Sequence, residues 1–479
     1  MKKYAIIILT VLLASACEKQ LNLEPKGSQN YDNYYKTKAE AIAAINAIYD
    51  VLGYVNLYSS NLWLIQDIGS DDCFLNEDLP DPNLRQIDQY DIQTNNNYLK
   101  GIWQDSYVGI HRANVAILKI PPIDMDETLK NRLLGEAKFL RSLFYFNLVR
   151  LFGDVPLVTV PSSTLSDYKV ARTSADTIYA KLIIPGFRDA SESLPPSYSG
   201  PDKGRATEGA ALGMLSEVYL TRHQWNRAAQ YGKEVMDLDV YGLWDDYADN
   251  FKEANYNGKE SVFEVQFNGE VPAEDSRIVI SGLPSIGAFP AGVEIMLPTE
   301  DLLNTFEEGD YRKDVTFFDS YNYFGTQTFY PHIWKHWDQS AYPARETGNT
   351  GADFMVMRYA QVLLMYAEAL NEANGGPTTE AYDAINQVRA RARNGNPGVL
   401  PDLSGLNQDE FRTAVYKEKR CETVNEGQRW YDLVRTGRLV ERVNAAKGAK
   451  ATPESFNTLF PVPQHERDVD PNLTQNEGY

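Results

Sequence analysis

The chain has 479 residues, a formal net charge of −20, and a hydrophobic content of 43%. A chain of this length can bury a large core, whereas its acidity argues against nucleic acid and other polyanionic ligands, which need basic surfaces. Beyond the N-terminus, no stretch of 18 apolar residues occurs, so the sequence predicts no membrane-spanning helix.

The N-terminal residues have the layout of a signal peptide. Two lysines precede the apolar run Ala5–Ala16, which is too short to span a bilayer and ends in small residues. The run Ala14-Ser15-Ala16-Cys17 resembles a lipobox, in which the cysteine takes a diacylglycerol, although Ala14 stands where Leu is usual. We therefore predict a signal peptide over residues 1–16 and acyl chains on Cys17 that hold the protein on a membrane. The alternative is an ordinary secretory signal that leaves Cys17 free.

Residues 17–35 are polar and predict a tether, and apolar residues then recur at helical spacing over much of the chain. Residues 131–152 are apolar almost all round, which indicates a helix buried on most sides. Gly153 and Pro156 follow as typical helix stop signals. The predicted helices and helix pairs are residues 38–52, 101–120, 131–152, 208–237, 360–392, 408–423 and 426–445.

Residues 208–237 have the spacing of a tetratricopeptide helix pair. Leu215, Ser216, Tyr219 and Ala228 are its large, small, aromatic and small positions, and the small residues let two helices approach closely. Two later segments predict similar pairs. The predicted fold class is therefore mostly α, a tetratricopeptide-like superhelix of helical pairs that carries an irregular, loop-rich insert.

Two regions do not fit helical pairs. Residues 70–98 are rich in Asp, Asn and Pro and predict a long loop. The predicted insert covers about residues 240–357. Within it, Ser261–Phe267 and Arg277–Ile280 have short β-like patterns, and residues 315–357 predict an aromatic-rich loop.

Several runs, in one order along the chain, together resemble the SusD/RagB family of outer-membrane lipoproteins. Among them are GEAKFLRSLFYFNLVRLFGDVPLV, MRYAQVLLMYAEALNE and NEGQRWYDLVRTGRL. A small departure lies at Glu418–Glu422, where Lys419 stands in an arginine position of the family pattern. The similar runs are residues 135–158, 204–220, 297–317, 357–372, 385–392, 425–439 and 461–479.

The resemblance implies a single domain over residues 36–479, with four tetratricopeptide-like pairs that face a transporter and with ligand bound in variable loops. It implies a protein that is not an enzyme and needs no cofactor. Such a protein captures an oligosaccharide or polysaccharide and delivers it to a SusC-like TonB-dependent transporter. The expected location is the outer membrane, lipid-anchored through Cys17 and facing the cell exterior.

Two irregular segments carry side chains suited to sugar recognition. The loop 67–81 supplies carboxylates and amides that can bond hydroxyl groups. The run 321–342 holds eight aromatic residues, whose flat faces match the apolar faces of sugar rings. We expect most of these rings to pack in the core and Trp334 and Trp337 to be exposed. The candidate ligand-binding residues are Asp71, Asp72, Phe74, Asn76, Tyr90, Tyr323, Trp334 and Trp337.

Other polar groups favour structural roles. The acidic loop lacks the EF-hand spacing of a calcium site, and the histidines of the aromatic run lack a metal-binding motif, so we predict no bound metal. Glu426, Arg429 and Asp432, on neighbouring turns of one predicted helix, could act as acid and base but favour a buried ion-pair network. Cys73 and Cys421 favour separate buried thiols over a disulfide.

Two other functions compete with glycan binding and delivery. A helical glycoside hydrolase or lyase should place two convergent acids with perturbed pKa values in a deep cleft. A structural adaptor should lack both such a cleft and an aromatic-lined surface. A glycan-binding protein should show the aromatic-lined surface.

Overall fold

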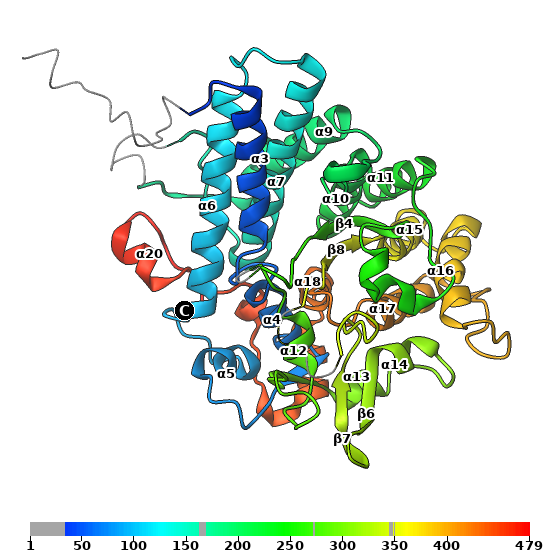
Figure 1. Cartoon of the computed structure of the whole chain (residues 1–479). Helices are drawn as coiled ribbons and strands as arrows, with labels where there is room; N and C mark the ends of the chain where they lie inside the picture. The colour runs from blue at the N-terminus through cyan, green and yellow to red at the C-terminus, as the bar shows by residue number, and fades with distance from the viewer. Residues whose placement is uncertain (1–33, 162–168, 272–273, 344–347, 349) are drawn as a thin grey trace, which may run out of the picture.

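The structure is a computed structural model that describes residues 34–161, 169–271, 274–343, 348 and 350–479. The predicted signal peptide, the predicted lipidation site Cys17 and the predicted tether up to residue 33 lie outside the described residues. Figure 1 shows long helices at the upper left, further helices at the right, and a β-hairpin that projects at the bottom. The prediction of a mostly α fold with a loop-rich insert is confirmed.

Helices α3, α6 and α7 form the long layer of Figure 1, where α3 lies against the other two, and the short helices α4 and α5 lie below it. Thr37 and Glu40 form a capping box that starts α3 as the apolar spacing predicts. Helix α7 begins before residue 131, because the Asp126 side chain caps it by accepting the Leu129 N–H at 2.9 Å. The helices are α3 (Lys38–Leu52), α4 (Asn61–Ile68), α5 (Pro82–Gln89), α6 (Asn97–Lys119) and α7 (Glu127–Phe152).

Helix α5 corrects the prediction that residues 70–98 form one long loop. The side chain of Asp81 caps this helix by accepting the Asn83 and Leu84 N–H groups at 2.9 and 3.0 Å. Pro82 occupies the first helical position, where its missing N–H costs nothing. The same acidic and proline residues that indicated a loop therefore start a helix.

The helix pair predicted at 208–237 is confirmed as α10 and α11, and Ser216 on α10 donates to the Ala228 carbonyl on α11 at 2.8 Å. Residues 426–445 form two helices rather than one, because Gly437 adopts a left-handed conformation with φ of 68°. The helices from residue 175 onward that lie outside the insert are α8 (Ala175–Ile178), α9 (Ile184–Ser193), α10 (Glu208–Thr221), α11 (Trp225–Asp237), α15 (Tyr359–Asn374), α16 (Thr379–Ala392), α17 (Gln408–Glu422), α18 (Arg429–Arg435), α19 (Leu439–Lys447) and α20 (Gln464–Val469).

The insert contains short antiparallel strand pairs and short helices. The strand predicted at Ser261–Phe267 is confirmed over most of its length, whereas Arg277–Ile280 leads into helix α12 and is not a strand. Residues 315–357 contain three strands and are not one loop. The strand pairs of the described chain, of which β2–β3 lies wholly outside the insert, are β1 (Cys73–Leu75) with β5 (Met296–Pro298), β2 (Val155–Pro156) with β3 (Arg172–Thr173), β4 (Ser261–Val265) with β8 (Phe354–Arg358), and β6 (Phe317–Asn322) with β7 (Thr326–Ile333); the short helices of the insert are α12 (Ile278–Gly282), α13 (Glu300–Leu303) and α14 (Tyr311–Thr316).

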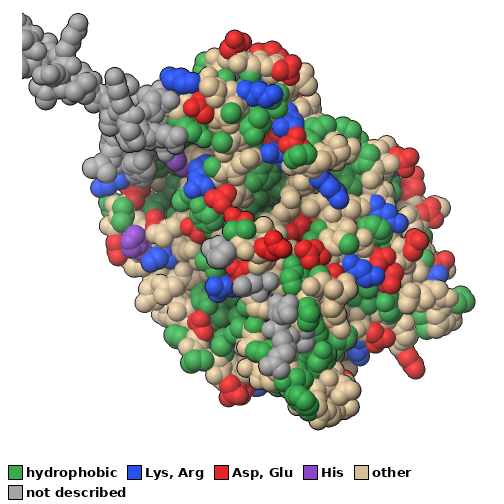
Figure 2. Space-filling view, viewed as in Figure 1, with side chains coloured by type: hydrophobic (Ala, Val, Ile, Leu, Met, Phe, Trp, Pro, Cys, Tyr) green, Lys and Arg blue, Asp and Glu red, His purple; other side chains and the backbone are tan. Residues whose placement is uncertain are grey.

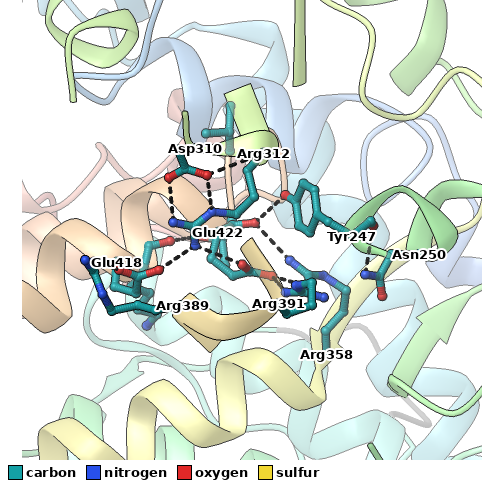
Figure 3. Close-up of polar contacts among 12 residues, drawn as sticks. Tyr247, Asn250, Asp310, Arg312, Arg358, Arg389, Arg391, Glu418 and Glu422 are labelled. Carbon is teal, nitrogen blue, oxygen red and sulfur yellow. Dashed lines mark hydrogen bonds and ion pairs between the residues drawn. The ribbon is translucent and has the colours of Figure 1, made fainter. Parts of the chain in front are cut away.

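Buried ion pairs join the insert to the C-terminal helices, as Figure 3 shows. Arg358 at the end of β8 contacts Glu422 at 2.8 Å and Glu426 at 2.7 Å. Arg312 of α14 contacts Asp310 and Glu418, each at 2.7 Å. All of these side chains are buried, so each charge depends on its partners.

This network confirms the structural interpretation of the predicted acid–base residues. Glu426 lies in the turn before α18 rather than on it and also contacts Lys335 at 2.6 Å. Asp432 contacts Lys419 and Arg435, each at 2.8 Å. Cys73 and Cys421 are buried and free, as predicted.

Candidate ligand-binding site

The two predicted aspartates are buried in ion pairs and are not available to a ligand. Asp71 accepts from Arg429 Nε at 2.7 Å, and Asp72 accepts from Arg420 Nε at 2.7 Å. Burial alone would raise the pKa of Asp71, but the nearby guanidinium groups outweigh it and hold that pKa well below its usual range. The prediction that Asp71 and Asp72 face a ligand is wrong. Their carboxylates are buried against arginines that lie far away in the sequence but close in the fold.

Tyr90 and Trp337 are also buried, contrary to prediction. The Tyr90 hydroxyl donates to the Gly69 carbonyl beneath α4. Trp337 is 6% exposed, packs edge-on against Phe289 and donates from Nε1 to the Tyr342 carbonyl at 2.9 Å. Both rings belong to the core, because the chain around each one folds back over it.

The other predicted residues keep part of their surface in solvent, and the structure brings the two predicted segments together. Pairing of β1 with β5 places the Phe74 ring 6.2 Å from the ring of Tyr330 on β7. At the turn of the same hairpin, Phe324 is 96% exposed. Figure 2 shows hydrophobic side chains at this lower end of the molecule. The partly exposed predicted residues, which stay predicted ligand contacts, are Phe74, Asn76, Tyr323 and Trp334.

Trp334 lines a cavity of about 370 Å³ beside α14, which we call the tryptophan cavity. Its ring stacks on Phe318 at 4.7 Å, and its Nε1 donates to the Asp314 carbonyl at 3.2 Å. Because the indole N–H is bonded within the protein, the ring offers a ligand mainly its apolar surface.

A second surface, which the sequence did not indicate, is a groove of about 510 Å³ between α3 and the end of β4. Figure 2 shows the viewed face hollowed between these two elements. Three aromatic rings line it, those of Tyr49, Tyr54 and Phe267. The volume lies within the range of natural small-molecule sites. The polar residues of its wall include Asn46, Asp50, Gln266, Asn268 and Glu274.

Hydrogen bonds hold the two tyrosine side chains of the groove and the backbone that carries the Phe267 ring. The Tyr49 hydroxyl accepts the Ala206 N–H at 3.0 Å, and the Tyr54 hydroxyl accepts from Arg112 at 3.0 Å. The backbone N–H of Phe267 donates to Asp353 at 3.0 Å. All three rings are half-buried. They therefore form a largely preformed surface, which reduces what must be ordered when a ligand binds.

A second cavity of about 330 Å³, which we call the side lobe, adjoins the groove. Residues 203–205 and Glu264 line both spaces, and we call these four residues the neck. Gly204 has φ of 93°, and a Cβ there would lie 1.9 Å from the Gln266 amide nitrogen. The Gln266 side chain is exposed and could move aside, so it is the positive φ that favours glycine at this position.

Charged groups fix the neck. Arg205 contacts Glu136 at 2.9 Å and Asp202 at 2.7 Å, and it also donates to the Asn46 side chain at 2.7 Å. These bonds hold the guanidinium in one position. The Arg205 side chain therefore has a fixed position between the groove and the side lobe.

Glu264 and Asp353 are two buried carboxyl groups that both accept hydrogen bonds from Asn257. The backbone N–H of Asn257 donates to Glu264 at 2.7 Å, and the side-chain amide of Asn257 donates to Asp353 at 3.4 Å. Burial raises the pKa of Glu264 to about 7. Burial, and then the nearby Glu264, raise the pKa of Asp353. Glu264 lines both cavities, whereas Asp353 is not among the lining residues of either one.

The sequence held only weak signals for this groove. Tyr49 lies within a helical repeat that predicts a core position, and Phe267 ends a predicted strand. The segment Gly53–Ser59, with two tyrosines directly after a helix, is a local signal that could have been used. The other contacts that shape the groove join residues far apart in the sequence, such as Tyr49 and Ala206, and no local pattern reveals them.

Within the described ranges, no helix is long and apolar enough to cross a membrane. The described residues also contain no group of three or more His, Cys, Asp or Glu side chains placed to hold a metal ion.

Two family models match the chain and together span most of it. One, described as "SusD family", matches residues 259–479. The other, described as "Starch-binding associating with outer membrane", matches residues 19–220. The chain belongs to the SusD/RagB family.

Relatives match the chain over its full length. SusD-like protein P2 of Formosa agariphila is 27% identical, with 100% of both chains covered. A SusD superfamily protein from Parabacteroides distasonis has a TM-score of 0.82 and 28% identity, covering 92% of this chain and 99% of its own. A structure described as a laminarin-binding SusD-like protein has a TM-score of 0.80 and 28% identity, covering 93% of this chain and 100% of its own.

Proposed function

We propose that this protein binds an oligosaccharide or polysaccharide in the groove between α3 and β4. The observation that carries the proposal is the groove and the adjoining side lobe, with three aromatic rings in the groove beside amide and carboxylate groups. Sugar rings have apolar C–H faces that stack on aromatic rings and hydroxyl groups that bond to amides and carboxylates. Two adjoining cavities, the groove and the side lobe, suit a chain of sugars better than a single small molecule.

Membership of the family and similarity to a laminarin-binding protein support glycan as the ligand class. The second family description supports association with the outer membrane. We further propose that acyl chains on Cys17 anchor the protein there, facing the cell exterior, and that a TonB-dependent transporter receives the glycan. The hairpin surface around Phe74 and Tyr330, together with the tryptophan cavity, is the alternative place for ligand.

The proposed role is binding rather than cleavage. A glycosidase needs two acids on opposite sides of the scissile bond. Glu264 faces both cavities, but its partner Asp353 does not line them and instead accepts the Phe267 N–H. Glu264 and Asp353 therefore position the backbone beside the groove and do not converge on a ligand.

A glycan array probed with the purified full-length protein in mild detergent tests the proposed function. We expect binding to one family of glycans, with no release of reducing ends when the best ligand is incubated with the protein. Sustained release that follows the intact protein would favour the hydrolase alternative. Affinity purification from native outer membranes should recover a TonB-dependent transporter, and recovery of the lipoprotein alone would contradict the proposed partnership.

A further inference from the structure

The side lobe has a charge balance opposite to that of the whole chain. Its charged lining residues are Lys203, Arg205, Lys259 and Glu264, so three cations face one acid. The protein as a whole carries a net charge of −20. A locally basic cavity in an acidic protein attracts anionic groups to that position while the rest of the surface repels them.

Two of these three cations have little compensation from protein acids. Arg205 is neutralised by Glu136 and Asp202. The Lys203 ammonium donates to the Tyr256 carbonyl at 3.2 Å, and its charge lowers the pKa of Glu264. Lys259 lies 3.8 Å from Asp245, whose side chain is fully exposed, and its ammonium lies 5.0 Å from the centre of the Trp244 ring, so both contacts are weak. The two lysines therefore keep most of their charge available to a ligand.

The single acid of the side lobe adds little opposing charge. Glu264 is buried near Asp353. It carries less than a full negative charge near neutral pH because burial raises its pKa. Hydroxyl groups of Ser197, Thr207 and Ser261 complete the polar wall. A group that accepts several hydrogen bonds and carries negative charge suits these donors.

We infer that the side lobe takes an anionic substituent of the glycan, a carboxylate or a sulfate ester, between Lys203 and Lys259. This inference rests on the proposed function, because it assigns a substituent to the sugar chain held in the adjoining groove. One substituent placed in a basic cavity is compatible with the acidity of the whole chain, which opposes a ligand charged along its full length.

The test uses a glycan array with two kinds of matched pairs, probed with the full-length protein in mild detergent. The first pair is oligogalacturonate and its carboxyl-reduced form, and the second is a carrageenan oligosaccharide and its desulfated form. Further neutral, uronic and sulfated glycans share the array. Isothermal titration then measures the best ligand against Lys203→Gln, Lys259→Gln and the double variant. Lys233→Gln, an exposed lysine on α11 outside both cavities, is the matched control.

We expect the wild type to prefer charged members of such pairs by about tenfold or more, with the preferred pair distinguishing carboxylate from sulfate. The double variant should lose most of that preference but keep the weaker binding of neutral members, and Lys233→Gln should behave as wild type. Added salt should reduce the preference. Equal binding of neutral and charged members, or a preference that survives the double substitution, overturns the inference and leaves the proposed function intact. A wild type that binds no glycan overturns both.

Discussion

At the scale of single residues, buried charges determine which parts of the chain hold it together. Asp71 lies among Arg420, Arg429 and Arg442, with the Arg429 and Arg442 nitrogens at 2.7 and 3.1 Å. Removing one partner of such a cluster leaves uncompensated buried charge and is strongly destabilising. The intact cluster itself contributes little net stability, because the cost of burying its charges offsets their attraction. The aspartates that the sequence suggested for ligand contact are therefore expected to matter for stability.

We predict that Asp71→Asn lowers the free energy of unfolding by about 3–5 kcal/mol at neutral pH, because three arginines lose their shared carboxylate. The folded state lowers the pKa of Asp71, so this stabilisation is present above the unfolded value of 3.8 and is lost as pH falls below it. Urea denaturation at several pH values measures both effects. Glu77→Gln, in an exposed pair with Lys450, is the control and should unfold as wild type. A neutral-pH midpoint unchanged by Asp71→Asn would contradict the prediction.

Glu264 should show the opposite dependence on pH. Its pKa is raised from 4.5 to about 7, so the contribution of the Glu264 carboxyl to stability is fully present below pH 4.5 and is lost as pH rises through 7. Neighbouring charges are Lys203, Arg358, Asp353 and, facing Asp353, Glu253. Glu264→Gln keeps an oxygen for the Asn257 N–H but cannot ionise.

We predict that Glu264→Gln unfolds like wild type at pH 5 and is more stable at pH 8, by about 1–3 kcal/mol. Thermal unfolding across this pH range measures the difference. A wild type as stable as the variant at pH 8 would show that the carboxyl pair ionises without cost.

At the scale of elements, local patterns predicted the long helices and failed where tertiary contacts decide. Apolar residues of α3 recur at helical spacing, and the residues of α7 are apolar almost all round and are followed by Gly153, so local patterns located both helices. Helix α5 was missed because Asp81 and Pro82 are common both in loops and at helix starts. Helix α12 was missed because its β-branched residues favour strands locally, while burial holds them in a single helical turn.

The predicted ligand residues failed for the same reason. Exposure of a loop residue depends on where the loop folds back, and the polar neighbours of Trp337 did not reveal the cover over its ring. The sequence indicated the aromatic run 321–342 and the polar loop 67–81 as candidates, and the structure places Tyr330 of the first next to Phe74 of the second. It did not indicate the groove, whose walls come from α3, residues 201–205 and the end of β4.

We predict that Trp337→Ala destabilises the protein by about 3–5 kcal/mol, since the ring is buried against Phe289 and Tyr321. Trp334→Ala should cost less, because that ring is only half-buried. Thermal unfolding of both variants tests this order. Equal, small shifts would mean that the Trp337 ring is exposed, as the sequence first suggested.

At the scale of the whole molecule, one buried core runs through the described chain from Ala41 to Leu473 and includes residues of both the helical pairs and the insert. The groove lies where these two parts meet. Its shape therefore depends on the packing of the scaffold as well as on its own residues. The predicted lipid anchor precedes α3, which itself forms one wall of the groove.

We predict that Cys17→Ala moves the protein from the membrane fraction to the soluble fraction and abolishes labelling by a radioactive fatty acid. The reason is that a second attachment to the bilayer is not indicated by the apolar pattern of the chain. Fractionation in high salt, which removes electrostatic attachment, is the measurement. A variant that still sediments with membranes would place the anchor elsewhere.

The location of the glycan site is the central claim, and one set of titrations tests it most directly. The best glycan of the array is titrated into wild type, Tyr54→Ala, Phe267→Ala, Trp334→Ala and Phe324→Ala, with Tyr54→Phe as the control that keeps the ring. Loss of one stacked ring should cost about 1–3 kcal/mol, or roughly 5- to 150-fold in affinity. We predict that only the two groove substitutions to Ala weaken binding, at near-normal melting temperature. Weakened binding in Trp334→Ala or Phe324→Ala, with the groove variants unaffected, would contradict the account and place the ligand on the tryptophan cavity or the hairpin.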